Sequence, residues 1–290
     1  MHPARSLIVF TSASGLGFGL LAFLCLGVPA VTGWVAAVFF ATGFALAGGG
    51  LAASTFHLGH PERALKAFTQ WRSSWLSREA WLAAATLAVC GLYAAALILT
   101  GIRLTPLGWI GSALALATVY ATSMIYAQLK TVPRWHHWST SAVFVGLAVT
   151  GGALLSGTVW LAVLAMLATG VLQFHTWKTG DRRLAASGTT LATATGLGGR
   201  GAVRAFEPPH TGGNYLTREM VFVVARKHAL KLRSIALVLG FLAPALLLLL
   251  PFTHLMAALA VASHIAGLLI LRWLFFAEAE HVVGLYYGKR

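Results

Sequence analysis

The longest apolar stretch of the chain, residues 138–177, reads WSTSAVFVGLAVTGGALLSGTVWLAVLAMLATGVLQFHTW. It contains no Asp, Glu, Lys or Arg. A single α-helix of this length would extend about 60 Å, roughly twice the thickness of the hydrocarbon core of a membrane. Ser156-Gly157 lies near the middle and is typical of a turn. The stretch therefore predicts two membrane-spanning helices rather than one.

The composition of the whole chain indicates the same class of protein. Of its 290 residues, 58% are apolar and only 10% are charged, whereas soluble domains carry roughly 25% charged residues. Backbone groups in hydrocarbon must form hydrogen bonds within their own segment, which favours helices. We predict an all-α integral membrane protein with eight transmembrane helices. The expected spans are about 7–28, 34–56, 80–100, 107–127, 138–155, 158–177, 220–250 and 253–276.

The distribution of positive charge supports eight spans independently. With eight, every Lys and Arg except Arg103 falls on the side that holds both termini. Merging 138–177 into one span would place the two most basic loops on opposite sides, against the positive-inside tendency. We therefore predict cytoplasmic termini and location in a bacterial inner membrane. The net charge of +14 then orients the chain and meets anionic lipid, which makes nucleic acid an unexpected partner. We interpret residues 7–28 as the first span, because this run is longer than the apolar core of a signal peptide.

A short pattern occurs twice along the chain. Phe56-His57 ends one apolar run and Ser77-Arg78-Glu79 opens the next, while Phe174-His175 and Thr217-Arg218-Glu219 hold the corresponding places further on. The two copies are four spans apart and so lie on the same side of the membrane. This indicates a duplicated unit of four spans.

The duplication predicts two tandem four-helix bundles, formed by residues 1–137 and 138–290. The second contains a long cytoplasmic loop, residues 178–218, which we interpret as a flexible or partner-docking element. In this copy Thr176-Trp177-Lys178 replaces the Leu58-Gly59-His60-Pro61 that follows His57. We therefore expect the first bundle to carry the chemistry and the second copy to be structural.

His57 and Glu79 are the candidate functional pair. Because the second and third spans are antiparallel neighbours, both residues belong at the depth where hydrocarbon meets lipid headgroups. An imidazole and a carboxylate at the rim of an apolar pocket suit a quinone, whose ring oxygens need a hydrogen-bond partner and a proton carrier. Each residue also has a structural explanation. His57 complements the carboxyl-terminal helix dipole, and Glu79 complements the dipole of a helix that Ser77 caps.

The positions of the cysteines, His264 and two tyrosines indicate which redox groups this chain could hold or contact. Cys25 and Cys90 both lie within apolar spans, so they cannot supply four thiolates to an iron–sulfur cluster and are interpreted as core residues. A haem-b anchor needs facing histidines inside the bilayer, and His264 is the candidate well inside a span. We expect no haem, iron–sulfur cluster or other metal in this chain. Tyr120 and Tyr126 are candidates either for a quinone oxygen or for anchors at the membrane interface.

Three segments resemble the membrane-anchor subunit of the dimethyl sulfoxide reductase family of molybdopterin oxidoreductases. They are His57-Leu58-Gly59-His60-Pro61-Glu62-Arg63-Ala64, Ser74-Trp75-Leu76-Ser77-Arg78-Glu79 and Thr131-Val132-Pro133-Arg134-Trp135. The resemblance extends over the eight-span pattern. Residues 206–233 are similar to the branch that serves sulfite-oxidising complexes.

The resemblance implies a complex of three subunits. A molybdopterin subunit would carry out the substrate chemistry and a four-cluster iron–sulfur subunit would carry electrons. The anchor would exchange them with menaquinone or ubiquinone. The family's quinol-site histidine and glutamate correspond to His57 and Glu79, and Arg78, His60 and Arg63 are the neighbouring candidates for quinone binding or proton relay. A passive anchor, a haem-b anchor and a transporter remain the alternatives. The terminal substrate and the direction of electron flow stay open, because the substrate chemistry would take place in another polypeptide.

Overall fold

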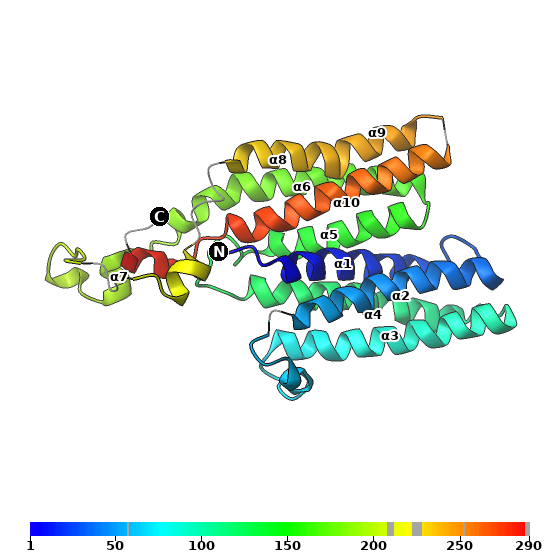
Figure 1. Ribbon diagram of the computed structural model, residues 1–290, viewed down its shortest axis with the longest axis horizontal. Helices are drawn as coiled ribbons and strands as arrows, with labels where there is room; N and C mark the ends of the chain where they lie inside the picture. Colours follow the sequence, from blue (N-terminus) through cyan, green and yellow to red (C-terminus); the bar gives the residue numbers. More distant parts are fainter. Residues whose placement is uncertain (57, 208–211, 222–227, 252, 288–290) are drawn as a thin grey trace.

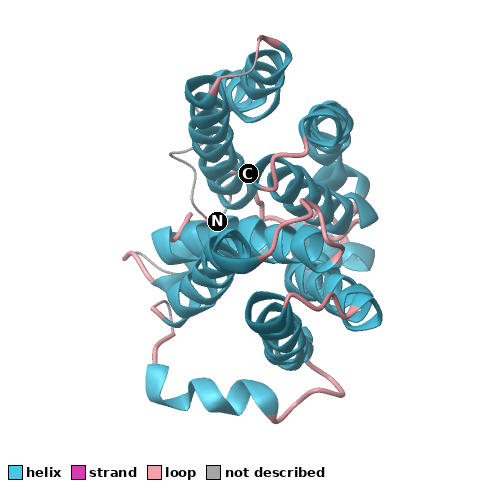
Figure 2. Ribbon diagram, turned by 90° about the vertical axis from the view of Figure 1, so that its right-hand side faces the viewer, coloured by secondary structure: helices cyan, strands magenta, loops and turns pink. Residues whose placement is uncertain are grey.

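The spans of the protein are helices that run side by side (Figure 1). The computed structural model describes residues 1–56, 58–207, 212–221, 228–251 and 253–287, and every regular element in these ranges is helical (Figure 2). Eight helical runs in the described ranges are long and apolar enough to cross a membrane, which confirms the predicted number. They are α1 (Arg5–Cys25), α2 (Gly33–Thr55), α3 (Trp75–Thr100), α4 (Thr105–Ala127), α5 (Trp138–Leu155), α6 (Val159–Ala186), the continuous run of α8 (Ala229–Leu237), η5 (Val238–Leu242) and α9 (Ala243–Leu249), and α10 (His254–Ala277).

The turn between α5 and α6 lies where the sequence predicts it. Helix α5 ends at Leu155, and Gly157 has a φ of +74°, in the left-handed region that favours glycine. The hydroxyl oxygens of Ser156 and Thr158 lie 2.6 Å apart across this turn. The 138–177 stretch thus crosses twice.

Helix α1 is the centre of the molecule, and most of it from Phe10 to Cys25 is buried. It packs on α2, α4 and α5, and glycines allow this close approach. A Cβ atom at Gly17 would collide with the backbone of Ala47 in α2, and one at Gly19 would collide with Ala148 in α5. Two hydrophobic clusters form around α1, one mainly from the first half of the chain and one mainly from the second. The division into two four-helix bundles stays a prediction, because α1 contributes to both clusters.

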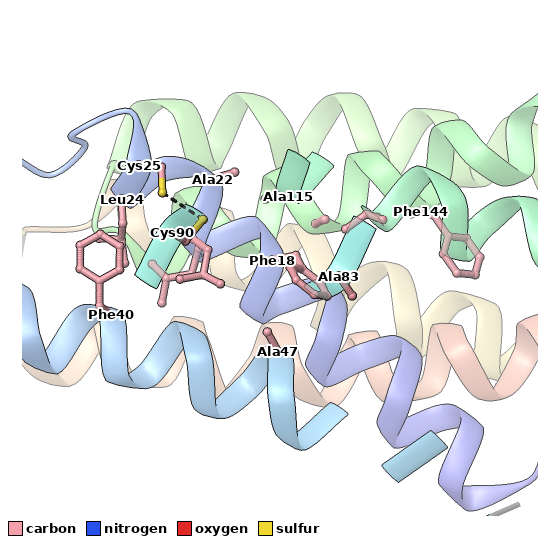
Figure 3. Close-up of a cluster of buried hydrophobic side chains, with 14 of the residues drawn as sticks. Phe18, Ala22, Leu24, Cys25, Phe40, Ala47, Ala83, Cys90, Ala115 and Phe144 are labelled. Carbon is pink, nitrogen blue, oxygen red and sulfur yellow. Dashed lines mark hydrogen bonds between the residues drawn. The ribbon is translucent and has the colours of Figure 1, made fainter. Parts of the chain in front are cut away.

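Cys25 and Cys90 meet in the first of these clusters (Figure 3). Their Sγ atoms, from α1 and α3, lie 3.2 Å apart, and both cysteines are free and buried. Gly111 of α4 covers the pair, since a Cβ atom there would lie 3.0 Å from the Cys25 sulfur. Both cysteines are core residues, as the sequence predicts, and their contact is a feature that the sequence did not reveal.

The seventh span differs from its prediction at its start. Thr217-Arg218-Glu219 lies in a short π-helical turn, η3 (Leu216–Met220), and the described spanning helix begins at Ala229. The prediction that this tripeptide opens the span is therefore wrong. Asn214 caps the start of this turn: its Oδ1 accepts from the Thr217 backbone N–H at 2.9 Å, and its own N–H donates to Thr217 Oγ1 at 3.0 Å. The turn ends at Val221, whose φ of −110° and ψ of 55° are not helical. Residues 222–227 lie outside the described ranges.

The predicted loop 178–218 is partly helical, because α6 continues through Ala186. The rest includes α7 (Leu191–Thr195) and η2 (Gly198–Arg200), and it lies at the same end of the molecule as both termini (Figure 1). The Tyr286 hydroxyl of η6 (Val282–Tyr287) donates to the Ala194 carbonyl at 3.1 Å. We call this end, where α2, α4, α6 and α10 finish, the basic end.

Candidate functional site

The segment between α2 and α3 carries three of the predicted site residues. Helix α2 ends at Thr55, and His57 lies outside the described residues. The following 3-10 helix, η1 (Pro61–Phe68), lies across the direction of the spans (Figure 2). On its exposed surface Glu62 Oε1 lies 2.9 Å from His60 Nδ1 and 3.9 Å from Arg63 Nε. His60 and Arg63 are therefore paired with Glu62 rather than with Glu79.

This segment folds back onto the first turns of α3. The Trp81 indole N–H donates to the Phe68 carbonyl at 3.0 Å, and the Gln70 backbone N–H donates to Ser77 Oγ at 3.2 Å. Helix α3 begins at Trp75, so Ser77 is not its cap and Glu79 lies beyond its first turn. The structural explanation of Glu79 as a first-turn residue capped by Ser77 is wrong, because the helix starts earlier than the tripeptide.

Glu79 is buried between α3 and α4, with 4% of its surface exposed. Its Oε1 accepts a hydrogen bond of 2.5 Å from the Thr122 hydroxyl of α4. Further along the same helix contact, the hydroxyl oxygens of Thr86 and Thr118 lie 2.9 Å apart. Glu79 thus heads a short polar row that runs inward from the basic end.

No cation neutralises Glu79 within the described part of the chain. Arg78, its neighbour in sequence, donates to the Trp71 and Arg72 carbonyls at 3.0 and 2.7 Å and stacks on the Trp75 ring at 4.4 Å. Burial of an unpaired carboxylate is costly, and binding of a proton removes most of that cost. Glu79 is therefore placed to hold and release a proton.

An exposed aromatic groove lies beside Glu79 on α3. Its volume is about 540 Å³, and its lining residues are Trp71, Trp75, Arg78, Trp81 and Leu82. Trp75 precedes Glu79 by one helical turn, so the groove begins within a turn of Glu79, whose buried carboxyl group is not one of its lining residues. Aromatic walls with one polar group at the rim suit a flat amphipathic ring.

Sequence reasoning missed Thr122 and the tryptophans of this groove. The signal for the groove was present, because Trp75, Arg78 and Leu82 recur at helical spacing within and just after a quoted motif. Thr122 had no such signal, since only the packing of α4 on α3 brings it to Glu79.

The two candidate tyrosines occupy different places. Tyr120 of α4 packs edge-on against Trp75, with ring centroids 6.1 Å apart, and so stands next to the groove. Tyr126 is buried in an aromatic cluster with Trp135, Phe275 and Phe276, with centroids between 5.3 and 5.6 Å away. Tyr126 is thus a core residue rather than an interface anchor.

The second copy of the sequence pattern is arranged differently. His175 is an exposed residue of α6, which continues beyond it, and its ring lies 6.4 Å from that of Trp138. The Glu219 side chain is 46% exposed and lies 3.9 Å from His2 Nδ1. The buried carboxyl of the first copy therefore has no counterpart at Glu219.

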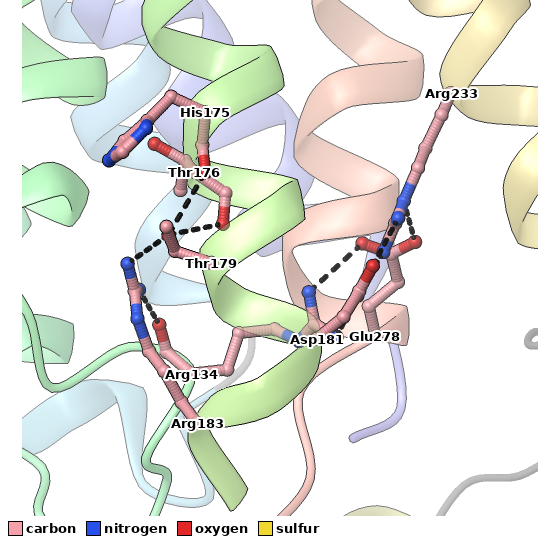
Figure 4. Close-up of polar contacts among 8 residues, drawn as sticks. All are labelled: Arg134, His175, Thr176, Thr179, Asp181, Arg183, Arg233 and Glu278. Carbon is pink, nitrogen blue, oxygen red and sulfur yellow. Dashed lines mark hydrogen bonds and ion pairs between the residues drawn. The ribbon is translucent and has the colours of Figure 1, made fainter. Parts of the chain in front are cut away.

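A network of ion pairs at the basic end joins the segment before α5 to α6, α8 and the end of α10 (Figure 4). Asp181 of α6 accepts from Arg134 at 2.7 Å and from Arg233 of α8 at 2.6 Å. Glu278 follows α10 as its cap and accepts from Arg233 Nε at 2.7 Å, with Arg134 Nη1 3.7 Å away. The Thr131–Trp135 motif therefore serves helix packing, because its Arg134 joins α6 to α10.

The haem candidate His264 has a structural role in the contact between α10 and the seventh span. Pro244 lacks the N–H that would reach the Gly240 carbonyl, and His264 Nδ1 donates to that carbonyl at 2.7 Å. Its Nε2 faces Gly151 of α5, where a Cβ atom would lie 3.6 Å away. Among the described residues, no three His, Cys, Asp or Glu side chains are grouped to hold a metal ion.

Comparison with known proteins identifies the family. The family described as DMSO reductase anchor subunit matches residues 1–288. The chain belongs to this family. Among its relatives is a sulfite dehydrogenase subunit of Allochromatium vinosum, 32% identical over 99% of each chain. No solved structure matches the chain. The predicted resemblance is confirmed, and the protein is a multi-pass membrane anchor of an oxidoreductase complex.

Proposed function

We propose that this anchor subunit is quinone-reactive. It exchanges electrons and protons between a partner iron–sulfur subunit and the quinone pool of the membrane. The observation that carries the proposal is Glu79, a buried carboxyl group with a hydroxyl partner and no cation within the described residues. It lies one helical turn from Trp75, which lines an aromatic groove. A purely passive anchor has no need of an unpaired buried carboxyl group at this depth.

The proposed role of each residue follows from where it lies. Reduction of a quinone takes up two electrons and two protons, and oxidation of the quinol releases them. The electrons come from or go to the partner, because two buried cysteines cannot hold a cluster here. The Trp groove holds the ring, Arg78 lies at its edge, and Glu79 carries protons to and from the ring oxygens. His57 is the second proposed contact to the ring, while the exposed His60 and Arg63 connect the site to water.

The proposed partners follow from the family. They are a four-cluster iron–sulfur subunit and a molybdopterin catalytic subunit, docked on the basic end at the cytoplasmic face of a bacterial inner membrane. The relative from a sulfite dehydrogenase favours sulfite as the electron donor. Sulfite and water would give sulfate, two protons and two electrons at the catalytic subunit, and menaquinone or ubiquinone would accept the electrons. The alternative is electron flow in the opposite direction, in which quinol reduces dimethyl sulfoxide. Turnover of the purified complex with sulfite and with dimethyl sulfoxide distinguishes the two directions.

Substitution of Glu79 tests the proposed quinone site. In the assembled complex, Glu79→Gln should lower quinone-coupled turnover by about 100-fold or more, because the amide cannot carry a proton. Glu219→Gln is the matched control from the second copy and should stay within about twofold. Turnover with an artificial dye that reacts at the partner subunits should be unchanged in both variants. Wild-type quinone turnover in Glu79→Gln would show that the anchor is passive.

A further inference from the structure

A second polar site lies in the half of the molecule that the quinone site does not use. It is a small cavity among α5, α6 and α10, with a volume of about 40 Å³. Arg272 of α10 lines it, together with Phe144 and Gln173. The Arg272 side chain is only 2% exposed, although it belongs to a membrane-spanning helix. Charged residues inside spanning helices are costly and usually mark a functional site.

Arg272 has no hydrogen bond or ion pair within the described chain. Its guanidinium carbon lies 3.8 Å from the centre of the Phe144 ring, and its buried Nε has no hydrogen-bond partner. Arg134 also lines the cavity, and its buried Nε is likewise unpartnered. Buried N–H donors of a charged group are costly to leave without an acceptor. Two arginines at one cavity thus have buried N–H groups that lack an acceptor.

The nearby carboxylates do not supply the missing negative charge. Glu278 lines the cavity, but its two oxygens face Arg233 and Arg134. Asp181 is likewise shared by Arg134 and Arg233 (Figure 4). Arg183 donates only to uncharged groups, the Arg134 carbonyl, His137, Ser139 and Thr179. Asp181 and Glu278 are thus shared by Arg134 and Arg233, and neither carboxylate contacts Arg272 within the described chain.

Among the other polar groups of the cavity, the Gln173 amide is the one with available hydrogen-bond donors. The Gln173 amide is buried and makes no hydrogen bond within the described residues, so its N–H groups are available. The hydroxyl hydrogens of Thr140 and Thr176 are used on the Trp135 and Leu172 carbonyls. One water needs about 10 to 15 Å³ of cavity volume, and this cavity has about 40 Å³. The space suits a few waters or one halide with water, and it is too small for a quinone ring.

We propose that this cavity binds a small monovalent inorganic anion of halide size, with the Arg272 guanidinium as its main donor and the Gln173 amide as the second. Water alone would satisfy the N–H groups but would leave the guanidinium charge uncompensated in a low-dielectric site. The bound anion would join α5, α6 and α10, because its neighbours come from all three helices.

Halide-dependent stability of the purified complex tests the proposal. Thermal unfolding is followed in sodium chloride, sodium bromide and sodium gluconate at equal ionic strength. We expect a saturable rise of the unfolding temperature in the halides of about 3 to 5 °C over gluconate. Bromide anomalous scattering from crystals of the complex should place one ion beside Arg272. Equal unfolding temperatures in all three salts, or a cavity that holds water or a lipid phosphate, would overturn the proposal.

Two variants and one control complete the test. Arg272→Met should abolish the halide effect, and Gln173→Leu, which keeps the charge, should raise the half-saturating halide concentration about fivefold. Arg200→Met, in the exposed loop, should leave the halide effect unchanged. If Arg272→Met does not fold, Gln173→Leu and the bromide peak in the wild-type protein still decide the matter. A halide effect that is unaltered in Gln173→Leu would argue against the site.

Discussion

Glu79 and Glu278 are both buried at the basic end, yet their surroundings are opposite. They are 4% and 5% exposed, respectively. Glu278 lies between Arg233 and Arg134, whereas Glu79 has the neutral Thr122 hydroxyl as its partner. A carboxylate between two guanidinium groups is stabilised as an anion and holds helices together. A carboxyl group with one hydroxyl partner is better suited to proton exchange. Burial alone therefore does not distinguish a structural acid from a functional one, but the charge of its partner does.

The largest expected difference between the two acids is in stability. Glu278→Gln should lower the free energy of unfolding by about 2 to 3 kcal/mol, because it leaves two mostly buried guanidinium groups without this carboxylate. Glu79→Gln should change it by less than about 0.5 kcal/mol, because the amide can still accept from Thr122. Thermal unfolding in detergent measures both. Equal destabilisation by the two variants would show that the charge of the partner does not distinguish the two acids.

The hydrogen bond from Thr122 should matter for turnover. Thr122→Val removes the donor that positions the Glu79 carboxyl group, and quinone-coupled turnover should fall about tenfold. Thr118→Val, which removes the neighbouring contact with Thr86, should change it by less than about twofold. The double variant Glu79→Gln/Thr122→Val should be no slower than Glu79→Gln alone, because Thr122 acts through Glu79. Additive losses in the double variant would show that Thr122 has a separate structural role.

The smallest expected effect is a pH response near the Glu278 network. His137 precedes α5, and its Nδ1 accepts from Arg183 at 3.0 Å and from the Ser139 N–H at 3.2 Å. Burial and then the Arg183 guanidinium hold the pKa of His137 below its usual value. Stability from this neutral histidine is complete above the unfolded pKa of about 6.5 and is lost as pH falls toward the lower folded pKa.

The wild-type unfolding temperature should therefore drop more between pH 7.5 and pH 5.5 than that of His137→Gln, by about 1 to 2 °C. His175→Gln, at the exposed histidine of α6, is the control and should follow the wild type. A wild-type drop that persists in His137→Gln would place the pH response at another group.

The predictions from sequence succeeded where the pattern of residues along the chain was sufficient to place a structural feature. The turn at Ser156-Gly157 needed only the length of an apolar run and a glycine. They failed at Thr217-Arg218-Glu219, because the short turn that Asn214 caps ends at Val221, and the repeat pattern did not reveal this break. Arg272 was counted as part of the basic side, and nothing in the spacing indicated that it would be buried without a partner.

The sequence by itself determined the class of the protein, the eight spans and the family, because hydropathy and motifs are properties of the chain. Only the tertiary structure decided which acids are paired. Glu79 meets Thr122 across the packing of α3 on α4, and Glu278 meets Arg134 and Arg233 from distant segments. Whether a buried charge is neutralised depends on residues far apart in the chain, and no local pattern records them.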